Sequence, residues 1–236
     1  MQDRYTGDVG DFVKYGLLRA ITGSKRLGIA WYLHPDAGPA GDGGHTEYLS
    51  QHERWQHLDP RLFEALKRIV SDDDRSVGSL QRSGVLGNAT FAGKRLDVSA
   101  VRWRERRDWR LRWFKETRNQ VAHCDVVFAD PDNGLVSDTR FRPERKEDAK
   151  RIPLAEATAL GEGRTAIIYH HNSRRVGGHL LEVRYWMKRL PGCSIAYYWR
   201  PWSNRTFFVV NADAEVARQL ERFAKRWEGH GELVRQ

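Results

Sequence analysis

Three short apolar runs constrain the fold of this chain most strongly. They read LGIAWYL (27–33), CDVVFADP (124–131) and RTAIIYHHN (164–172). Each has the length of a strand, and near-continuous apolar character is typical of a strand that is covered on both faces of a sheet. Each run also ends in a polar or glycine-rich stretch, which indicates a turn. The three runs therefore predict three buried, mostly parallel strands.

Segments with helical periodicity separate these strands. Phe12, Tyr15, Leu18 and Ile21 are spaced for one helix face, with Asp11 as the candidate N-cap. Further helices are expected at 61–70, 102–120, 153–160, 177–190 and 214–228, and a strand pair at 193–201 and 204–212. The stretch 76–96 is ambiguous and leaves room for one strand, and 136–151 is expected to be a surface loop. The alternation predicts a Rossmann-like α/β fold, with a mostly parallel sheet flanked by helices and an antiparallel hairpin near the C-terminus.

Length and composition bound the class of protein. The 236 residues, 40% hydrophobic and 30% charged, predict one folded domain over 1–236, with an N-terminal helical motif at 5–22 and a basic helical insertion at about 55–120. The apolar runs are too short for a membrane-spanning helix, and the N-terminus lacks the pattern of a signal peptide. Cys124 and Cys193 show no paired spacing, so a reduced, cytoplasmic compartment is expected.

Positive charge dominates the chain and favours a polyanionic partner. The net charge is +9, and the segment RWRERRDWRLRWFKETR (102–118) holds eight basic residues and three tryptophans. Trp109 and Trp113 share a helix face, so the segment is either a plain amphipathic helix with a solvated basic side or a surface for nucleic-acid phosphates. The predicted nucleic-acid-binding residues are Arg104, Arg106, Arg107, Arg110, Arg174 and Arg175.

The stretch DVVFADPDNGL (125–135) carries the main candidate site. Asp130 interrupts an apolar strand end, where a carboxylate must be paired, solvated in a cleft or bound to a ligand. The plain alternative is a turn in which Asp132 and Asn133 serve the backbone. Ligands of open α/β sheets bind at the carboxyl ends of the strands. The loops 34–45, 130–135 and 169–175 are therefore expected to meet.

Other polar stretches flank this expected site. The glycine-rich PDAGPAGDGG (35–44) follows the first strand and would allow a backbone to approach a nucleoside closely. Asp8, Asp11 and Lys14 surround the start of the first helix. His170 and His171 are adjacent in a strand, so they should point to opposite faces.

The order of these motifs resembles that of a known enzyme family. The opening GDVGDFVKY is similar to the GNHADVLKH opening of bacterial 23S ribosomal RNA adenine-N6 methyltransferases of the large-subunit J type, and VVFADPDN aligns with a strand that ends there in Asp-Pro-Pro-Tyr. The loop after the first strand, the aromatic strand AIIYHHN and the closing strand FFVVNA follow in the same order. The resemblance spans most of the chain and implies a Rossmann-like methyltransferase domain that uses S-adenosylmethionine.

The resemblance also assigns roles to individual residues. Asp130 would accept a hydrogen bond from the target amino group, with Asp132 and Asn133 beside it and Lys14 near the cofactor and the reacting centre. Asp132 and Asn133 stand where the family has proline and tyrosine. The implied cofactor-binding residues are Tyr5, Asp36, Gly38 and Gly41. No clear acid for the cofactor's ribose is visible after a second strand.

Two other classes of function remain open. Asp130 and Asp132, joined by Asp8, Asp11 or His170, would suit Mg²⁺ or Mn²⁺ in a nuclease or another enzyme that processes phosphodiesters. The third class is a non-catalytic nucleic-acid-binding module with the same fold. The sequence alone favours the methyltransferase and leaves open whether the partner is RNA or DNA.

Overall fold

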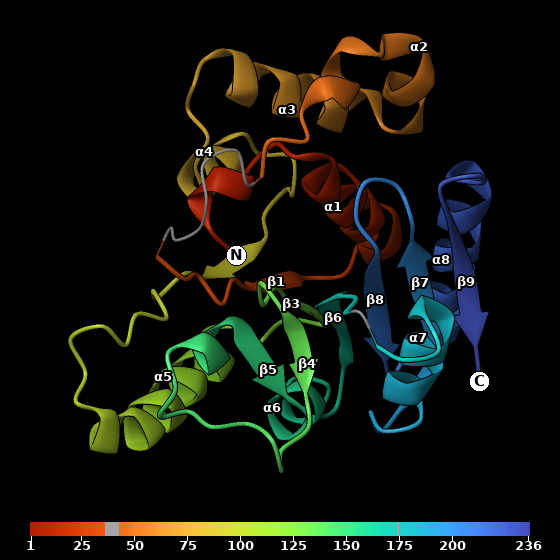
Figure 1. The fold of residues 1–236 in the computed structure, drawn as a ribbon. Helices are drawn as coiled ribbons and strands as arrows, with labels where there is room; N and C mark the ends of the chain where they lie inside the picture. Colours follow the sequence, from red (N-terminus) through yellow and green to blue (C-terminus); the bar gives the residue numbers. More distant parts are fainter. Residues whose placement is uncertain (36–42, 174) are drawn as a thin grey trace.

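A seven-stranded sheet forms the centre of the molecule (Figure 1). The computed structural model describes residues 1–35, 43–173 and 175–236. Within them the strand order is β2-β1-β3-β6-β8-β7-β9. The bounds are β1 Leu27–Ala30, β2 Thr90–Ala92, β3 Val126–Ala129, β6 Thr165–His171, β7 Cys193–Trp199, β8 Arg205–Val210 and β9 Gly231–Arg235. The first four strands are parallel, and β8, β7 and β9 are joined by antiparallel pairing. The predicted α/β fold class is confirmed.

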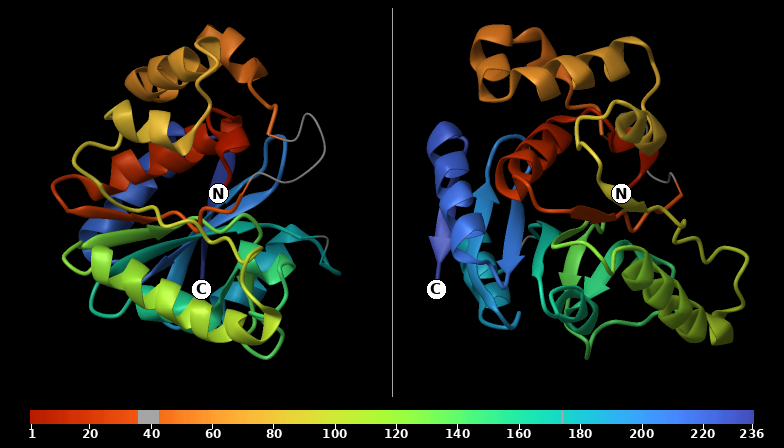
Figure 2. Two further views of the ribbon diagram at one scale, coloured as in Figure 1. Left: turned by 90° about the vertical axis from the view of Figure 1, so that its left-hand side faces the viewer. Right: turned by 180° about the vertical axis from the view of Figure 1, so that it is seen from behind.

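Helices cover both faces of this sheet (Figure 2). On one side lie α1 (Val9–Thr22), α3 (Pro60–Ser71), α4 (Val77–Arg82) and α8 (Ala214–Arg226). On the other lie α5 (Arg106–Gln120), α6 (Leu154–Leu160) and α7 (His179–Met187). Alternation along the strands explains the two layers: Phe128 packs in the first core and Val127 in the second, so β3 is apolar on both faces.

Smaller elements complete the described fold. A two-stranded parallel sheet pairs β4 (Gly134–Val136) with β5 (Arg151–Pro153). The short helix α2 spans His52–Trp55. The 3-10 turns span Asp3–Tyr5, Glu47–Ser50, Gln56–Leu58, Trp103–Glu105 and Glu147–Lys150. Among the described residues, no helix has the length and apolar character needed to cross a membrane.

The structure differs from two of the predictions. Helix α1 begins at Val9 and is capped by Asp8, which accepts from the Asp11 amide, so the prediction of Asp11 as N-cap is wrong. Gly7 adopts a φ of +86° and Asp8 is extended, so the chain turns into the helix three residues earlier than expected. The expected insertion at about 55–120 is divided, because β2 within it pairs with β1 in the sheet. Between β4 and β5, residues 137–150 form the expected loop, which contains the 3-10 turn Glu147–Lys150.

Chain order across the sheet marks one place for a ligand. From β1 the chain passes to β2 on one side and then returns to β3 on the other. Such a reversal leaves a crevice beyond the carboxyl ends of the two central strands, where ligands of open α/β sheets bind. Asp130 follows β3 directly and therefore lies at this crevice.

Candidate functional site

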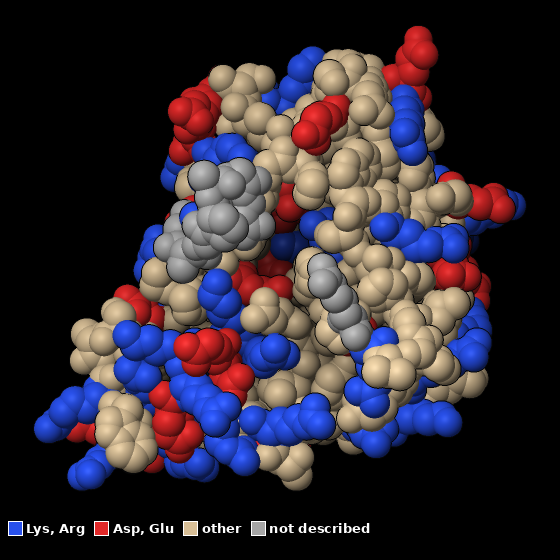
Figure 3. Space-filling view, viewed as in Figure 1, with Lys and Arg blue, Asp and Glu red and all other residues tan. Residues whose placement is uncertain are grey.

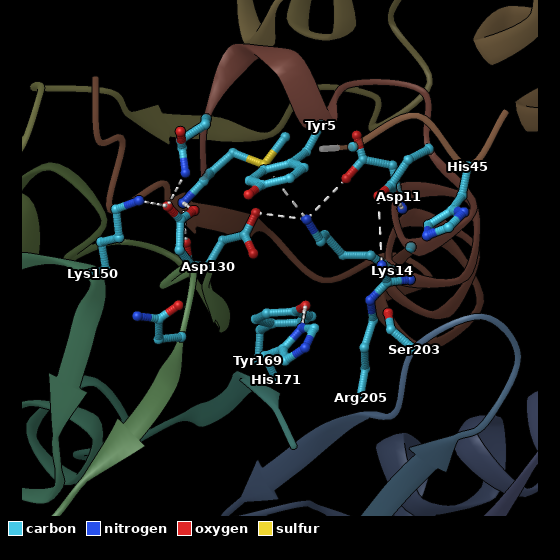
Figure 4. Close-up of a pocket in the computed structure, with 17 residues that line it drawn as sticks. Tyr5, Asp11, Lys14, His45, Asp130, Lys150, Tyr169, His171, Ser203 and Arg205 are labelled. Carbon is cyan, nitrogen blue, oxygen red and sulfur yellow. Dashed lines mark hydrogen bonds and ion pairs between the residues drawn. The ribbon is translucent and has the colours of Figure 1, made fainter. Parts of the chain in front are cut away.

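A cavity of about 310 Å³ lies at this edge of the sheet (Figure 4). Its wall is built from the N-terminal segment, the first turns of α1, the residues that follow β3 and the ends of β6 and β8. Figure 3 shows the hollow in the face of the molecule, with both acidic and basic side chains inside it. All four predicted catalytic residues, Lys14, Asp130, Asp132 and Asn133, line this one cavity.

Lys14 and two carboxylates form the buried centre of the cavity. Lys14 Nζ lies 2.8 Å from Asp130 Oδ2 and 2.9 Å from Asp11 Oδ1. All three residues are at most 5% exposed. Lys14 is one turn beyond Asp11 on α1, whereas Asp130 comes from the end of β3, so the ion pairs join the helix to the sheet.

Burial and charge shift the ionisation of this cluster. Burial opposes the charge on Lys14, but Asp11 and Asp130 outweigh it and raise the pKa of the ammonium group. Burial, aided by the neighbouring Asp8 and Asp130, raises the pKa of Asp11 to about 6 against the pull of Lys14. The cavity thus holds a permanent cation beside a carboxyl group that exchanges a proton near neutral pH, which suits proton transfer or the orientation of a polar substrate.

Asp132 has partners of its own, so its charge does not face the cavity uncompensated. The amino group of Met1 lies 2.5 Å from its Oδ1, and Gln2 Nε2 donates to its Oδ2 at 2.6 Å. Burial would raise the pKa of Asp132, but the amine, Gln2 and Lys150 hold it below its ordinary value. Asn133 is exposed at the rim, and its backbone amide donates to the carbonyl of Lys150. Asp132 is therefore a neutralised wall residue rather than a second free carboxylate.

The two adjacent histidines point to opposite faces of the sheet. His171 lines the cavity, where its ring neighbours the Tyr169 hydroxyl. His170 is buried on the far side: its Nδ1 accepts from the Leu135 amide at 2.9 Å, and its Nε2 lies 3.1 Å from Glu182 Oε1. Because Nδ1 accepts a backbone hydrogen, the proton of the neutral ring is assigned to Nε2. His170 thus serves the packing of the second core and does not reach the cavity.

Four of the five residues of the alternative metal site, Asp8, Asp11, Asp130 and Asp132, line the cavity, but they are not arranged around a common point for a metal ion. His170 faces away, Asp132 is paired with Gln2 and the Met1 amine, and Asp8 is occupied as the cap of α1. Lys14 Nζ itself lies between Asp11 and Asp130, where a shared cation would have to bind. Across the described ranges, no group of three or more His, Cys, Asp and Glu side chains is arranged to hold a metal ion.

A second hollow of about 280 Å³ lies at the ends of β1 and β2. Its walls include Pro35 and Val98, and the exposed Asp97, in the loop after β2, stands at its edge. Asp97 accepts from the Ser99 amide at 2.8 Å, and the hydrogen bonds from Ser99 lower the pKa of the carboxyl group. Lys150 lines both hollows, so the two adjoin each other.

Asp97 is a candidate that the sequence reasoning missed. It lies in the loop after β2, which was hard to identify because β2 has only three residues, Thr90–Ala92, and lacks a clear apolar run. Of the predicted cofactor residues, Tyr5 lines the first cavity. Asp36, Gly38 and Gly41 lie outside the described residues.

Only some of the arginines predicted to form a basic surface are exposed. Arg110 is 4% exposed and makes a two-pronged ion pair with Glu156, at 2.8 Å and 2.7 Å, so its assignment to a phosphate-binding surface is corrected. Burial opposes its charge, but Glu156 raises the pKa of its guanidinium. Arg106 is half-buried and donates to the carbonyls of Val101 and Glu144. Both arginines therefore hold α5 in place.

Other predicted arginines remain accessible. Arg104 is exposed beside the Trp103 ring, and Arg107 is exposed and paired with Glu144. Arg175 is exposed and lies 3.6 Å from the centre of the Tyr185 ring, whereas Arg174 lies outside the described residues. Figure 3 shows Lys and Arg side chains gathered over α5, with acidic side chains among them. This face can attract a polyanion only where positive charges outnumber the neighbouring negative charges.

Two comparisons with known proteins found no match. No protein-family model matches this chain, and no curated protein matches it. The functional assignment therefore rests on the geometry of the two hollows.

Proposed function

We propose that this chain is an S-adenosylmethionine-dependent methyltransferase that acts on a base in RNA or DNA. The observation that carries the proposal is the position of Asp130, which directly follows β3 at the reversal of strand order and is paired with Lys14 in the wall of a cavity. A buried carboxylate held there by a buried cation is a preorganised acceptor for a substrate's hydrogen-bond donor.

The two adjoining hollows fit the proposed cofactor and substrate. The hollow at the ends of β1 and β2 has the apolar walls Pro35 and Val98 for a nucleoside, and Asp97 offers a carboxylate to ribose hydroxyls. The deeper cavity has the polar Lys14, Asp11 and Asp130 and the aromatic Tyr169 in its wall. A nucleoside in the hollow beside Asp97 would reach the deeper cavity past Lys150, which lines both.

The residues of the chain supply orientation rather than a nucleophile. S-adenosylmethionine, when bound, supplies a methyl group activated by the sulfonium. Asp130 accepts a hydrogen bond from the target amino group and directs the nitrogen lone pair toward the donor. Lys14 fixes the rotamer of Asp130 through its Oδ2. Asp11, with a pKa raised to about 6 by burial beside Asp8, is the group placed to accept the proton that the amino group releases after transfer.

Aromatic side chains of the cavity take the place of the tyrosine that the resembling family has at position 133. Tyr5 and Tyr169 both line the cavity, and Lys14 Nζ lies 5.3 Å from the centre of the Tyr169 ring (Figure 4). A base that leaves its stack needs an aromatic or apolar surface to replace its stacking neighbours. These rings support a flipped base as the substrate in spite of Asn133.

The test is transfer of a labelled methyl group. Purified protein is incubated with S-adenosylmethionine labelled in the methyl group and with RNA or DNA, and incorporation into each is counted. We expect incorporation into one of them, and a loss of at least about a hundredfold in Asp130→Asn, since misplacing the acceptor removes orientation. Asp73→Asn is the matched control, because Asp73 is exposed in a turn with φ of +52°, which asparagine tolerates. Equal incorporation by both variants would overturn the assignment of Asp130.

A further inference from the structure

Arg205 is a buried cation in the cavity that the proposed chemistry does not use. It begins β8, is 6% exposed and lines the cavity on the side opposite Lys150 (Figure 4). Register places it directly across from His171 of β6, so both strands present a side chain at the same edge. A buried guanidinium must find acceptors, because leaving its donors unsatisfied is costly.

Within the described residues, the partners of Arg205 do not satisfy all of its hydrogen-bond donors. Its nearest carboxylate is Asp8, at 3.5 Å from Nη2, and Asp8 also caps α1. Its Nη1 is buried and has no hydrogen-bond partner among the described residues. Burial opposes the charge, yet Asp8 and Tyr169 raise the pKa of the guanidinium, so it stays a cation. Tyr169 and Asp8 thus engage part of the guanidinium, and Nη1 keeps a buried donor without an acceptor among the described residues.

Neighbouring residues give the guanidinium of Arg205 room and add further hydrogen-bond donors beside it. Gly10 of α1 faces it, and a Cβ there would lie 2.2 Å from Nη1, so the lack of a side chain at Gly10 makes room for the guanidinium. Ser203 lines the same cavity, and its buried Oγ also lacks a hydrogen-bond partner within the described ranges. The first turn of α1 adds the positive end of a 14-residue helix.

We propose that Arg205 and Ser203 form an oxyanion-binding subsite of the cavity. The proposal extends the proposed function, since the oxyanion belongs either to the carboxylate of the methyl donor or to a phosphate of the nucleic acid next to the target base. Arg205 Nη1 and Ser203 Oγ donate to it, while Asp8 keeps the guanidinium oriented. The Asp8 carboxylate also repels the anion, which favours a group held by several donors over a free ion.

The test compares three variants, first with three small-molecule probes and then with an oligonucleotide. The variants are Arg205→Gln, Ser203→Ala and, as the matched control on the same hairpin, Arg200→Gln, since Arg200 is exposed and outside the cavity. The probes are inorganic phosphate, S-adenosylhomocysteine and 5′-methylthioadenosine, which lacks the carboxylate. Binding is measured by calorimetry, with phosphate followed by the shift in Tm. Circular dichroism checks folding, and Arg205→Lys replaces Arg205→Gln if the latter unfolds.

Two results support the subsite and identify its source. If it holds the carboxylate, Arg205→Gln weakens S-adenosylhomocysteine about tenfold or more but leaves methylthioadenosine unchanged. If it holds a phosphate, S-adenosylhomocysteine is unaffected, whereas binding of an oligonucleotide weakens by a similar factor. In both cases Ser203→Ala has a smaller effect in the same direction, and Arg200→Gln has none.

The remaining results separate this proposal from the proposed function. If phosphate raises the Tm of the wild type but not of Arg205→Gln, while S-adenosylhomocysteine fails to bind, the subsite stands and the methyltransferase assignment fails. If S-adenosylhomocysteine and the oligonucleotide bind Arg205→Gln as tightly as the wild type, and phosphate shifts both Tm values equally, the subsite is overturned and the methyltransferase assignment is untouched.

Discussion

The ammonium group of Lys14 lies 2.8 Å from Asp130 Oδ2, across 116 positions of sequence. This buried ion pair ties helix α1 to the end of β3, and Asp11 joins it from the same helix. A lysine within reach of two carboxylates takes the place of a shared metal ion and leaves a carboxylate in a defined orientation. The methyltransferase proposal depends on that orientation.

Removal of the Lys14 charge should be costly for stability. Lys14→Met leaves Asp11 and Asp130 buried without their cation, so we expect the free energy of unfolding to fall by about 3–5 kcal/mol. Lys25→Met is the matched control, because Lys25 pairs with the half-exposed Asp213 and should cost about 1 kcal/mol or less. Urea denaturation followed by circular dichroism measures both. Similar losses in the two variants would contradict a buried role for Lys14.

The helix α5 should depend on Arg110 rather than on its exposed neighbour. Arg110→Ala removes the ion pair with Glu156 and leaves that carboxylate buried beside Tyr32, whose hydroxyl donates to it at 2.9 Å. We expect a loss of about 3–5 kcal/mol in the free energy of unfolding. Arg107→Ala, on the same helix, should cost about 1 kcal/mol or less because its ion pair is exposed. A larger effect of Arg107 in thermal or urea unfolding would refute this division.

The raised pKa of Asp11 predicts a pH dependence with a definite sign. Burial raises its pKa from 3.8 to about 6, so the folded state binds this proton more tightly than the unfolded state. The contribution is fully present below about pH 4 and is lost as the pH rises through about 6. The free energy of unfolding of the wild type minus that of Asp11→Asn should therefore decrease between pH 4 and 7. A difference that is constant or increases over this range would count against the assignment.

The accessible arginines should govern binding to nucleic acid. We expect the triple change Arg104→Glu, Arg107→Glu and Arg175→Glu to weaken binding and to reduce the slope of log affinity against log salt by about 0.9 for each duplex phosphate that the variant no longer neutralises. Fluorescence anisotropy at several salt concentrations measures both quantities. The control carries the same charge change on α3 and α8, at Arg61, Arg68 and Arg218. Equal weakening by both triples would mean that only net charge matters and that α5 is not the interface.

Much of the fold was predictable because local patterns agreed with tertiary structure. The apolar runs before Asp130 and His171 became β3 and β6, since a strand buried on both faces needs continuous apolar character. Local signals failed where an element is short or stabilised from a distance. The three residues Thr90–Ala92 form a strand only because β1 pairs with them. Since no local pattern indicated this strand, Asp97 in the loop after it was not recognised as a candidate.

The sequence allowed the residues of the candidate site to be identified, but not the ion pairs that these residues form with one another. Asp130 and Lys14 were both identified as candidates, but their ion pair depends on how α1 packs on the sheet, which no local pattern specifies. For Arg110, the local sequence led to a wrong prediction for the same reason. Its place in a basic run suggested a surface, whereas Glu156, 46 positions away, buries it. Arg205 gave no signal in the sequence, since its significance comes from Gly10 and Ser203 around it.

Calorimetric titration of the purified protein with S-adenosylhomocysteine measures whether this chain binds the product of the proposed methyl donor. We expect one binding site with micromolar affinity, weakened about tenfold or more in Asp97→Ala and retained in Asp130→Asn, because Asp97 would hold the ribose whereas Asp130 would hold the substrate. Absence of binding to the wild type, under conditions where circular dichroism shows it folded, would contradict the claim that this chain is a methyltransferase.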